Sequence, residues 1–214
     1  MSAGRDEEPA IPGAHRDLPP LGTHELEALR DHVLVHSVRR GDFVLKSGAR
    51  SSWFIDAKQT ICRPEAMLLA ADAILSVVPP DATAIGGLTM GADPVAFVTA
   101  ALAATRGRAL KAFSVRKEVK DHGGGGRVAG ALDPGDRVVV AEDAVTRGTS
   151  LLEAARVVRE VGAEPVLLVA LVDRGGTVAR LARAEGIPFR AVLTAPDLGF
   201  AYEGGEEGGG RLPG

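Results

Sequence analysis

The chain has 214 residues, of which 45% are hydrophobic, and this is enough to bury one substantial core in one domain. A formal net charge of −3 provides no basic excess, so we expect no nucleic-acid partner, and no apolar run reaches the roughly 20 residues that span a bilayer. The single cysteine, Cys62, cannot form an intramolecular disulfide, which favours the cytoplasm. No nucleophile motif surrounds Cys62, and we expect a small buried residue there.

Both ends of the chain offer little that a core could bury. We therefore expect flexible tails at residues 1–22 and 200–214 and a single domain over residues 23–199. Capping and spacing predict a first helix that starts at Thr23 and ends at Gly41, followed by short extended segments at 42–45 and 52–56. Pro64 suits the first turn of a second helix. The predicted buried stripe of this second helix is Leu68, Ala71, Leu75 and Val78.

The rest of the domain alternates strands with helices, which is typical of a parallel sheet covered on both faces. The predicted strands are residues 82–86, 110–115, 137–145, 165–172 and 189–193. The predicted helices are residues 93–107, with Asp93 as N-cap, 150–161 and 177–185. Residues 116–136 show no periodicity and contain four consecutive glycines, which predicts a long mobile loop. In such an α/β fold, ligands bind at the carboxyl ends of the strands.

The most informative segment is VVVAEDAVTRGTS, residues 138–150, in which a buried strand leads to two carboxylates and then to a helix. Glu142 and Asp143, expected to be exposed at the strand end, can accept hydrogen bonds from a ribose diol. The loop after them holds Thr146, Gly148, Thr149 and Ser150. Its hydroxyls and the helix N-terminus suit a monophosphate, although taken alone they could merely cap the helix. Two adjacent carboxylates repel each other and therefore favour a ligand site.

This segment resembles the signature with which type I phosphoribosyltransferases bind phosphoribosyl pyrophosphate (PRPP). The resemblance implies PRPP contacts along the whole motif, at Glu142, Asp143, Ala144, Val145, Thr146, Arg147, Gly148, Thr149 and Ser150. Arg147 is bulkier than the small residue expected inside such a loop.

A second segment, VRKEVKDHGG at residues 115–124, resembles the mobile catalytic loop of orotate phosphoribosyltransferases. The resemblance of this segment implies that Arg116, Lys117, Lys120 and His122 bind PRPP. The two segments together imply that Lys120 and Asp143 are catalytic. Without the family, the segment could be a solvated charged loop, but the glycine run that follows could hinge a lid. In the family this lid serves the neighbouring subunit, which implies a homodimer.

Two further segments resemble the same enzymes and concern the acceptor. LKSGARSSWFIDAK, residues 45–58, implies that Lys46 reaches PRPP and that Phe54 and Ile55 lie against the ring of orotate. Without the family, Trp53 and Phe54 are more typical of a core.

In LVDRGG, Arg174 occupies the family position whose guanidinium pairs with the carboxylate of orotate, and Thr146 is a second implied orotate contact. Met90 stands where some members of the family have a lysine.

The resemblance implies a type I phosphoribosyltransferase fold with a central parallel sheet, a small N-terminal hood and the mobile loop. The implied reaction converts orotate and PRPP to orotidine 5′-monophosphate and pyrophosphate in de novo UMP synthesis. The implied cofactor is Mg²⁺, carried mainly by the pyrophosphate of PRPP with no metal ligand from the protein. Because the PRPP motif is shared across acceptors, a phosphoribosyltransferase for another base stays open, as does a non-catalytic PRPP-sensing regulator.

Overall fold

The computed structural model describes residues 22–44, 50–118 and 126–203. Its central sheet has six strands in the order β5-β4-β3-β6-β7-β8. All neighbours in this sheet are parallel except β4 and β5. The strands are β3 (Ala84–Leu88), β4 (Lys111–Val115), β5 (Val128–Gly130), β6 (Arg137–Val145), β7 (Glu164–Asp173) and β8 (Phe189–Thr194). The predicted α/β class with a mostly parallel sheet is confirmed.

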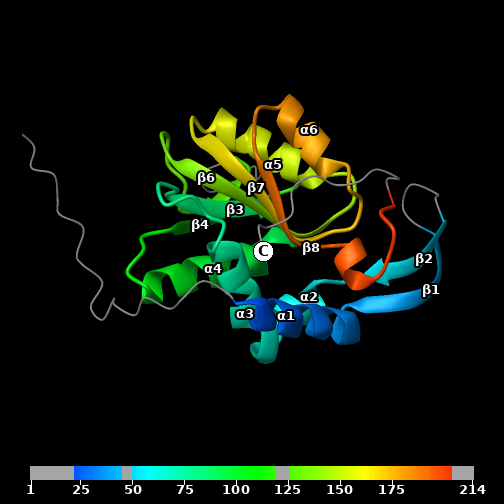
Figure 1. The fold of residues 1–214 in the computed structure, drawn as a ribbon. Coiled ribbons are helices and arrows are strands. Elements are labelled where there is room, and N and C mark those ends of the chain that lie inside the picture. Colours follow the sequence, from blue (N-terminus) through cyan, green and yellow to red (C-terminus); the bar gives the residue numbers. More distant parts are fainter. Residues whose placement is uncertain (1–21, 45–49, 119–125, 204–214) are drawn as a thin grey trace, which may run out of the picture.

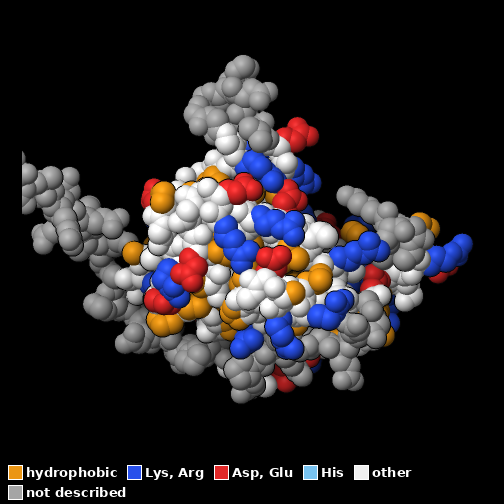
Figure 2. Space-filling view, turned by 90° about the horizontal axis from the view of Figure 1, so that it is seen from above, with side chains coloured by type: hydrophobic (Ala, Val, Ile, Leu, Met, Phe, Trp, Pro, Cys, Tyr) orange, Lys and Arg blue, Asp and Glu red, His pale blue; other side chains and the backbone are white. Residues whose placement is uncertain are grey.

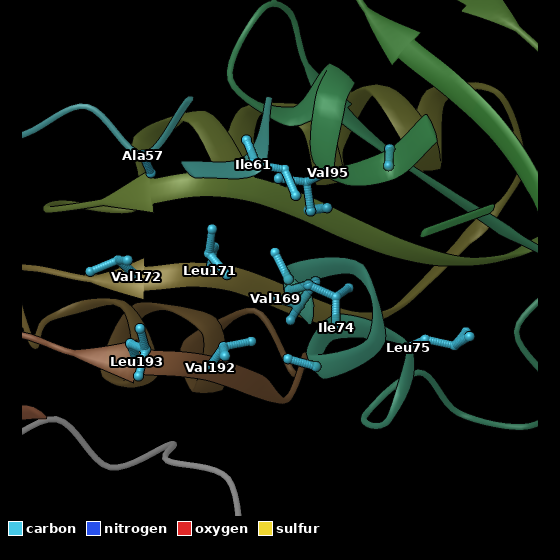
Figure 3. Packing of buried hydrophobic residues seen from close by; sticks show 14 of the residues in the cluster. Ala57, Ile61, Ile74, Leu75, Val95, Val169, Leu171, Val172, Val192 and Leu193 are labelled. Atoms are coloured by element: carbon cyan, nitrogen blue, oxygen red, sulfur yellow. The ribbon is translucent and has the colours of Figure 1, made fainter. Parts of the chain in front are cut away.

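Helices cover both faces of this sheet (Figure 1). One face carries α3 (Pro64–Leu75) and α4 (Ala92–Thr105), and the other carries α5 (Thr149–Glu160) and α6 (Val178–Ala184). Because alternate side chains of a strand point to opposite faces, β6 serves two cores: Val139 and Ala141 join the α3 and α4 side, and Val138 and Val140 join the other. Figure 3 shows the first core, in which β7 and β8 pack against Ile74 of α3.

A smaller unit stands beside the sheet and corresponds to the expected hood. It consists of α1 (Thr23–His36), the antiparallel pair β1 (Val38–Val44) and β2 (Arg50–Ile55), and α2 (Lys58–Ile61). Trp53 of β2 is buried and stacks on Phe200, with 4.3 Å between ring centroids. Phe200 follows a short 3-10 helix, η1 (Pro196–Leu198), so the segment after β8 anchors the hood. The predicted C-terminal tail therefore starts too early, because its first residues pack against the domain.

The boundaries of the first two helices were wrong where long-range packing overrides the local pattern. The first helix ends at His36 and not at Gly41, because the chain from Val38 onward pairs with β2. Leu68 of α3 was predicted to be buried but is 59% exposed. It lies outside the buried face of this helix, which is lined mainly by alanines. Val78 is buried but lies beyond the end of the helix.

Three other local predictions also fail. Asp93 lies inside the first turn of α4, whose N-cap is Gly91, and its carboxylate instead accepts hydrogen bonds from Thr89 Oγ1 (2.6 Å) and Ser114 Oγ (2.7 Å). Strand β5 occupies part of the predicted 116–136 loop. Cys62 is exposed and not buried, because it follows the last residue of the short helix α2.

The outer face over α5 and α6 carries basic and acidic side chains interspersed with one another (Figure 2). Arg159 of α5 pairs with Glu185 at 2.8 Å, and Arg156 lies 3.8 Å from the same carboxylate. None of the helices in the described ranges is both long and apolar enough to cross a membrane.

Candidate active site

The described site residues that follow strands of the central sheet lie at one edge of it. Strands β3, β4, β6 and β7 run parallel, so their carboxyl ends meet at the same edge. The loops that leave these ends carry Met90, Arg116, Thr146 and Arg174 respectively. Residues from four separate segments are thereby brought to one place.

The two carboxylates of the motif lie within the last residues of β6 and are buried, with 6% exposure for Glu142 and 5% for Asp143. They were expected to be exposed. The loop before α4 covers them: a methyl group added at Gly91 would lie 1.9 Å from Glu142 Oε1 and 2.7 Å from Asp143 Oδ1. The backbone of this loop thus rests directly on the acidic pair.

The two carboxyl groups of the acidic pair differ in their hydrogen-bond partners. Asp143 Oδ2 accepts a hydrogen bond from Lys58 Nζ at 2.6 Å, and Oδ1 accepts one from the Ala144 N–H at 2.9 Å. Burial and the charge of Asp143 raise the pKa of Glu142 to about 9. Burial alone would lower the pKa of Lys58, but pairing with Asp143 raises it overall. At neutral pH, Glu142 is therefore protonated and the Lys58 amine is an ammonium group.

The loop after β6 ends in a glycine that the geometry requires. Gly148, the N-cap of α5, has φ of 73°, and an added methyl group would lie 3.0 Å from Val178 Cγ2 of α6. No side chain forms a cap hydrogen bond at this helix, so the hydroxyls of Thr149 and Ser150 do not serve as its N-cap. The first-turn N–H groups of α5 remain suited to an anion. Arg147 is exposed, so its bulk does not fill the loop.

Arg174 is buried and already has a carboxylate partner. Its Nη2 donates to Glu203 Oε1 (2.5 Å), the carbonyl oxygen of Trp53 (2.6 Å) and Ser51 Oγ (2.9 Å), and its guanidinium carbon lies 4.8 Å from the centroid of the Trp53 ring. Arg174 Nε and Glu203 Oε2 are buried without a hydrogen-bond partner among the described residues. The guanidinium therefore holds this carboxylate through one nitrogen and keeps unused donor capacity.

The loops after β6 and β7 are held together by hydrogen bonds. The Arg174 N–H donates to the carbonyl oxygen of Val145 at 2.8 Å, and Thr177 Oγ1 donates to the carbonyl oxygen of Thr146 at 3.0 Å. The predicted phosphate loop and the predicted acceptor residue are consequently neighbours.

Phe54 and Ile55 are the two residues that were expected to lie against the ring of orotate. Side chains alternate along β2, so Phe54 is 39% exposed whereas Ile55 packs into the core on the other face. Their side chains therefore lie on opposite faces of β2, and the contact of both with one ring stays a prediction. The exposed Phe54 ring is the one that a ligand can reach.

The basic segment is described only at its start. Arg116 is half-buried and Lys117 is exposed. The Arg116 N–H donates to the carbonyl oxygen of Arg127 at 2.7 Å, which fixes the base of this segment to the strand pair β4 and β5. Lys46, Lys120 and His122 lie outside the described residues. Within the described ranges, no three His, Cys, Asp or Glu side chains form a group that could hold a metal ion.

Two residues at this site escaped the sequence analysis, Lys58 and Glu203. The partner of Lys58 lies 85 positions away in the chain, and Glu203 lies in a glycine-rich stretch interpreted as a tail. Neither has a local signal.

No family model matches the chain, but individual proteins of similar sequence and structure do. The orotate phosphoribosyltransferase of Nostoc sp. is 38% identical over 176 residues, covering 82% of this chain and 85% of the relative. That of Streptomyces avermitilis is 40% identical over 177 residues, covering 82% and 95%. The Mycobacterium tuberculosis enzyme, crystallised in complex with PRPP, matches with a TM-score of 0.69 at 34% identity over 82% of this chain and 99% of that one. The chain belongs to the orotate phosphoribosyltransferase family.

Proposed function

We propose that this protein transfers the ribose 5-phosphate unit of PRPP to orotate in the cytoplasm, forming orotidine 5′-monophosphate and pyrophosphate. One observation carries the proposal: the loop that suits a phosphate lies beside the buried Arg174. The Arg174 N–H donates to the carbonyl oxygen of Val145 at 2.8 Å. A sugar phosphate on the loop and an acidic ring on the arginine would be neighbours, as a transfer reaction requires. The relatives named as orotate phosphoribosyltransferases support the same reaction.

On the donor side, the first turn of α5 and the hydroxyls of Thr146, Thr149 and Ser150 would hold the 5-phosphate. Asp143 would accept a hydrogen bond from one ribose hydroxyl. Glu142, whose pKa is raised by burial and by Asp143, can donate its proton to another oxygen. The backbone of Ala144, Val145, Arg147 and Gly148 would complete this contact.

The pyrophosphate needs cations, because negative charge accumulates on it as the bond to the sugar breaks. Arg116 and Lys117 lie at the correct sheet edge for this role. We assign Lys46, Lys120 and His122 to it on their sequence motif alone. Mg²⁺ bound to the pyrophosphate would neutralise part of the same charge, and we propose that the oxygens of PRPP carry it. The residues then act by preorganised electrostatics, without a covalent nucleophile.

On the acceptor side, Arg174 would pair with the carboxylate of orotate while the exposed ring of Phe54 contacts its flat face. Glu203 occupies the same guanidinium in this structure. The incoming carboxylate would displace Glu203 or bind the guanidinium through a nitrogen such as Nε, which has no hydrogen-bond partner among the described residues.

The proposed reaction predicts a loss of orotate ultraviolet absorbance when the protein is mixed with orotate, PRPP and Mg²⁺. Adenine, hypoxanthine and uracil serve as alternative acceptors in the same assay. Turnover with one of these and not with orotate would replace the proposed acceptor. Tight PRPP binding without turnover of any base would favour a PRPP-sensing regulator.

We also propose that the protein is a homodimer in which Lys120 acts in the partner's site. Lys120→Ala and Arg174→Ala homodimers should each be nearly inactive, whereas subunit exchange between them should restore activity, because one site of each heterodimer has both residues intact. Activity is measured after mixing, and exchange is followed by native mass spectrometry of differently tagged subunits. Confirmed exchange with no recovery would mean that Lys120 acts within its own subunit.

A further inference from the structure

Lys58 reaches the acidic pair from the hood, far away along the chain. It is the first residue of α2, and its Nζ lies 2.6 Å from Asp143 Oδ2 and 3.7 Å from Asp56 Oδ1. The Asp143 side chain is 8% exposed and that of Lys58 is 41% exposed. The ammonium group therefore stands between a buried carboxylate and solvent.

This contact gives the second oxygen of the Asp143 carboxylate a hydrogen-bond donor. One carboxylate oxygen is held by the Ala144 N–H, and Lys58 holds the other, which fixes the rotation of the carboxylate plane. Among the described residues, Lys58 is the only cation that forms an ion pair with Asp143. Without Lys58, the buried carboxylate of Asp143 would lose the cation that pairs with it among the described residues.

The loop that rests on the pair cannot replace this charge. The backbone of Gly91 touches both carboxylates, but the neighbouring side chain is Met90, which is uncharged and 68% exposed. The cation at this position is thus supplied by the hood and not by the sheet.

We propose that Lys58 is a positioning residue of the donor site, which fixes the Asp143 carboxylate in the orientation that accepts the ribose hydroxyls. This inference rests on the proposed function of the acidic pair. Exposed ion pairs usually contribute little to stability. Here the partner, Asp143, is buried and has a proposed role in binding, so loss of Lys58 should weaken substrate binding as well as stability.

Lys58→Met, which keeps the length of the side chain and removes its charge, should lower kcat/KM for PRPP by about ten- to a hundredfold, the worth of one charged hydrogen bond. The KM for orotate should change little. Lys58→Arg keeps the charge and should recover most of the loss. The readouts are steady-state kinetics with each substrate varied in turn and calorimetric titration with PRPP and Mg²⁺.

Lys111→Met is the matched control. Lys111 is 35% exposed and lies 2.7 Å from Asp136 Oδ2, whose side chain is 8% exposed, so the pair has the same character as Lys58 and Asp143. Lys111 is the first residue of β4 and Asp136 directly precedes β6, so the pair lies at the amino ends of these strands, away from the site. Lys111→Met should keep wild-type kinetics. If Lys58→Met behaves in the same way, Lys58 is a structural ion pair and the inference fails.

A double-mutant cycle tests whether Lys58 acts through Asp143. If it does, Lys58→Met added to Asp143→Asn should lower kcat/KM for PRPP no further than Asp143→Asn alone. Additive losses would mean that Lys58 contacts the substrate independently and would overturn the positioning role. If the wild-type protein bound no PRPP at all, the proposed function would fail first, and this inference with it.

Discussion

Asp143→Asn should lower kcat/KM for PRPP by about a hundredfold or more while the protein keeps its fold, because the amide has nearly the same shape but no charge. In the native site, both oxygens of Asp143 accept hydrogen bonds, from Lys58 Nζ and from the Ala144 N–H. The amide has one acceptor oxygen, so its NH₂ group would face one of these two donors. The carboxylate offered to the ribose would be lost together with its orientation.

Asp136→Asn is the control for this substitution. Asp136 is 7% exposed, pairs with Lys111 and accepts a hydrogen bond from Thr83 Oγ1 at 2.8 Å, but it lies at the other end of β6. It should lose thermal stability and keep its kinetics. Circular dichroism melting and steady-state rates on both variants give the comparison. Wild-type turnover by Asp143→Asn would remove the acidic pair from the mechanism.

The sequence predicted what is encoded within short segments. The run 138–150 contains a buried strand, two carboxylates and a glycine in a left-handed turn, and each of these is a local requirement that a single segment can meet. The same holds for the alternation of strands and helices. The order of those strands, with β3 between β4 and β6, depends on contacts between distant segments.

Three of the failures have the same cause, which is a partner from elsewhere in the chain. Glu142 and Asp143 were expected to be exposed, but the Gly91 loop and Lys58 cover them. Helix α1 was predicted too long because residues after it pair with β2. The tail was predicted from its glycines, although Glu203 is held by Arg174. Local composition cannot predict such contacts.

Arg174→Ala should raise the KM for orotate far more than the KM for PRPP, because the guanidinium is assigned to the acceptor. It should also lower the free energy of unfolding by about 3 kcal/mol, since it leaves the carboxylate of Glu203 buried without its cation. Steady-state kinetics and denaturant unfolding measure the two effects separately. Trp53, the single tryptophan of the chain, contacts Arg174, so its fluorescence should report orotate binding.

Glu203→Gln separates binding from stability. The amide keeps a hydrogen-bond acceptor for Arg174 and removes the charge that competes with the orotate carboxylate, so the KM for orotate should stay unchanged or fall. The double variant Arg174→Ala and Glu203→Gln no longer buries an unpaired charge. It should regain much of the lost stability but keep the high orotate KM. If the orotate KM recovered together with stability, or if Arg174→Ala raised both KM values equally, Arg174 would hold the hood in place and bind no acceptor.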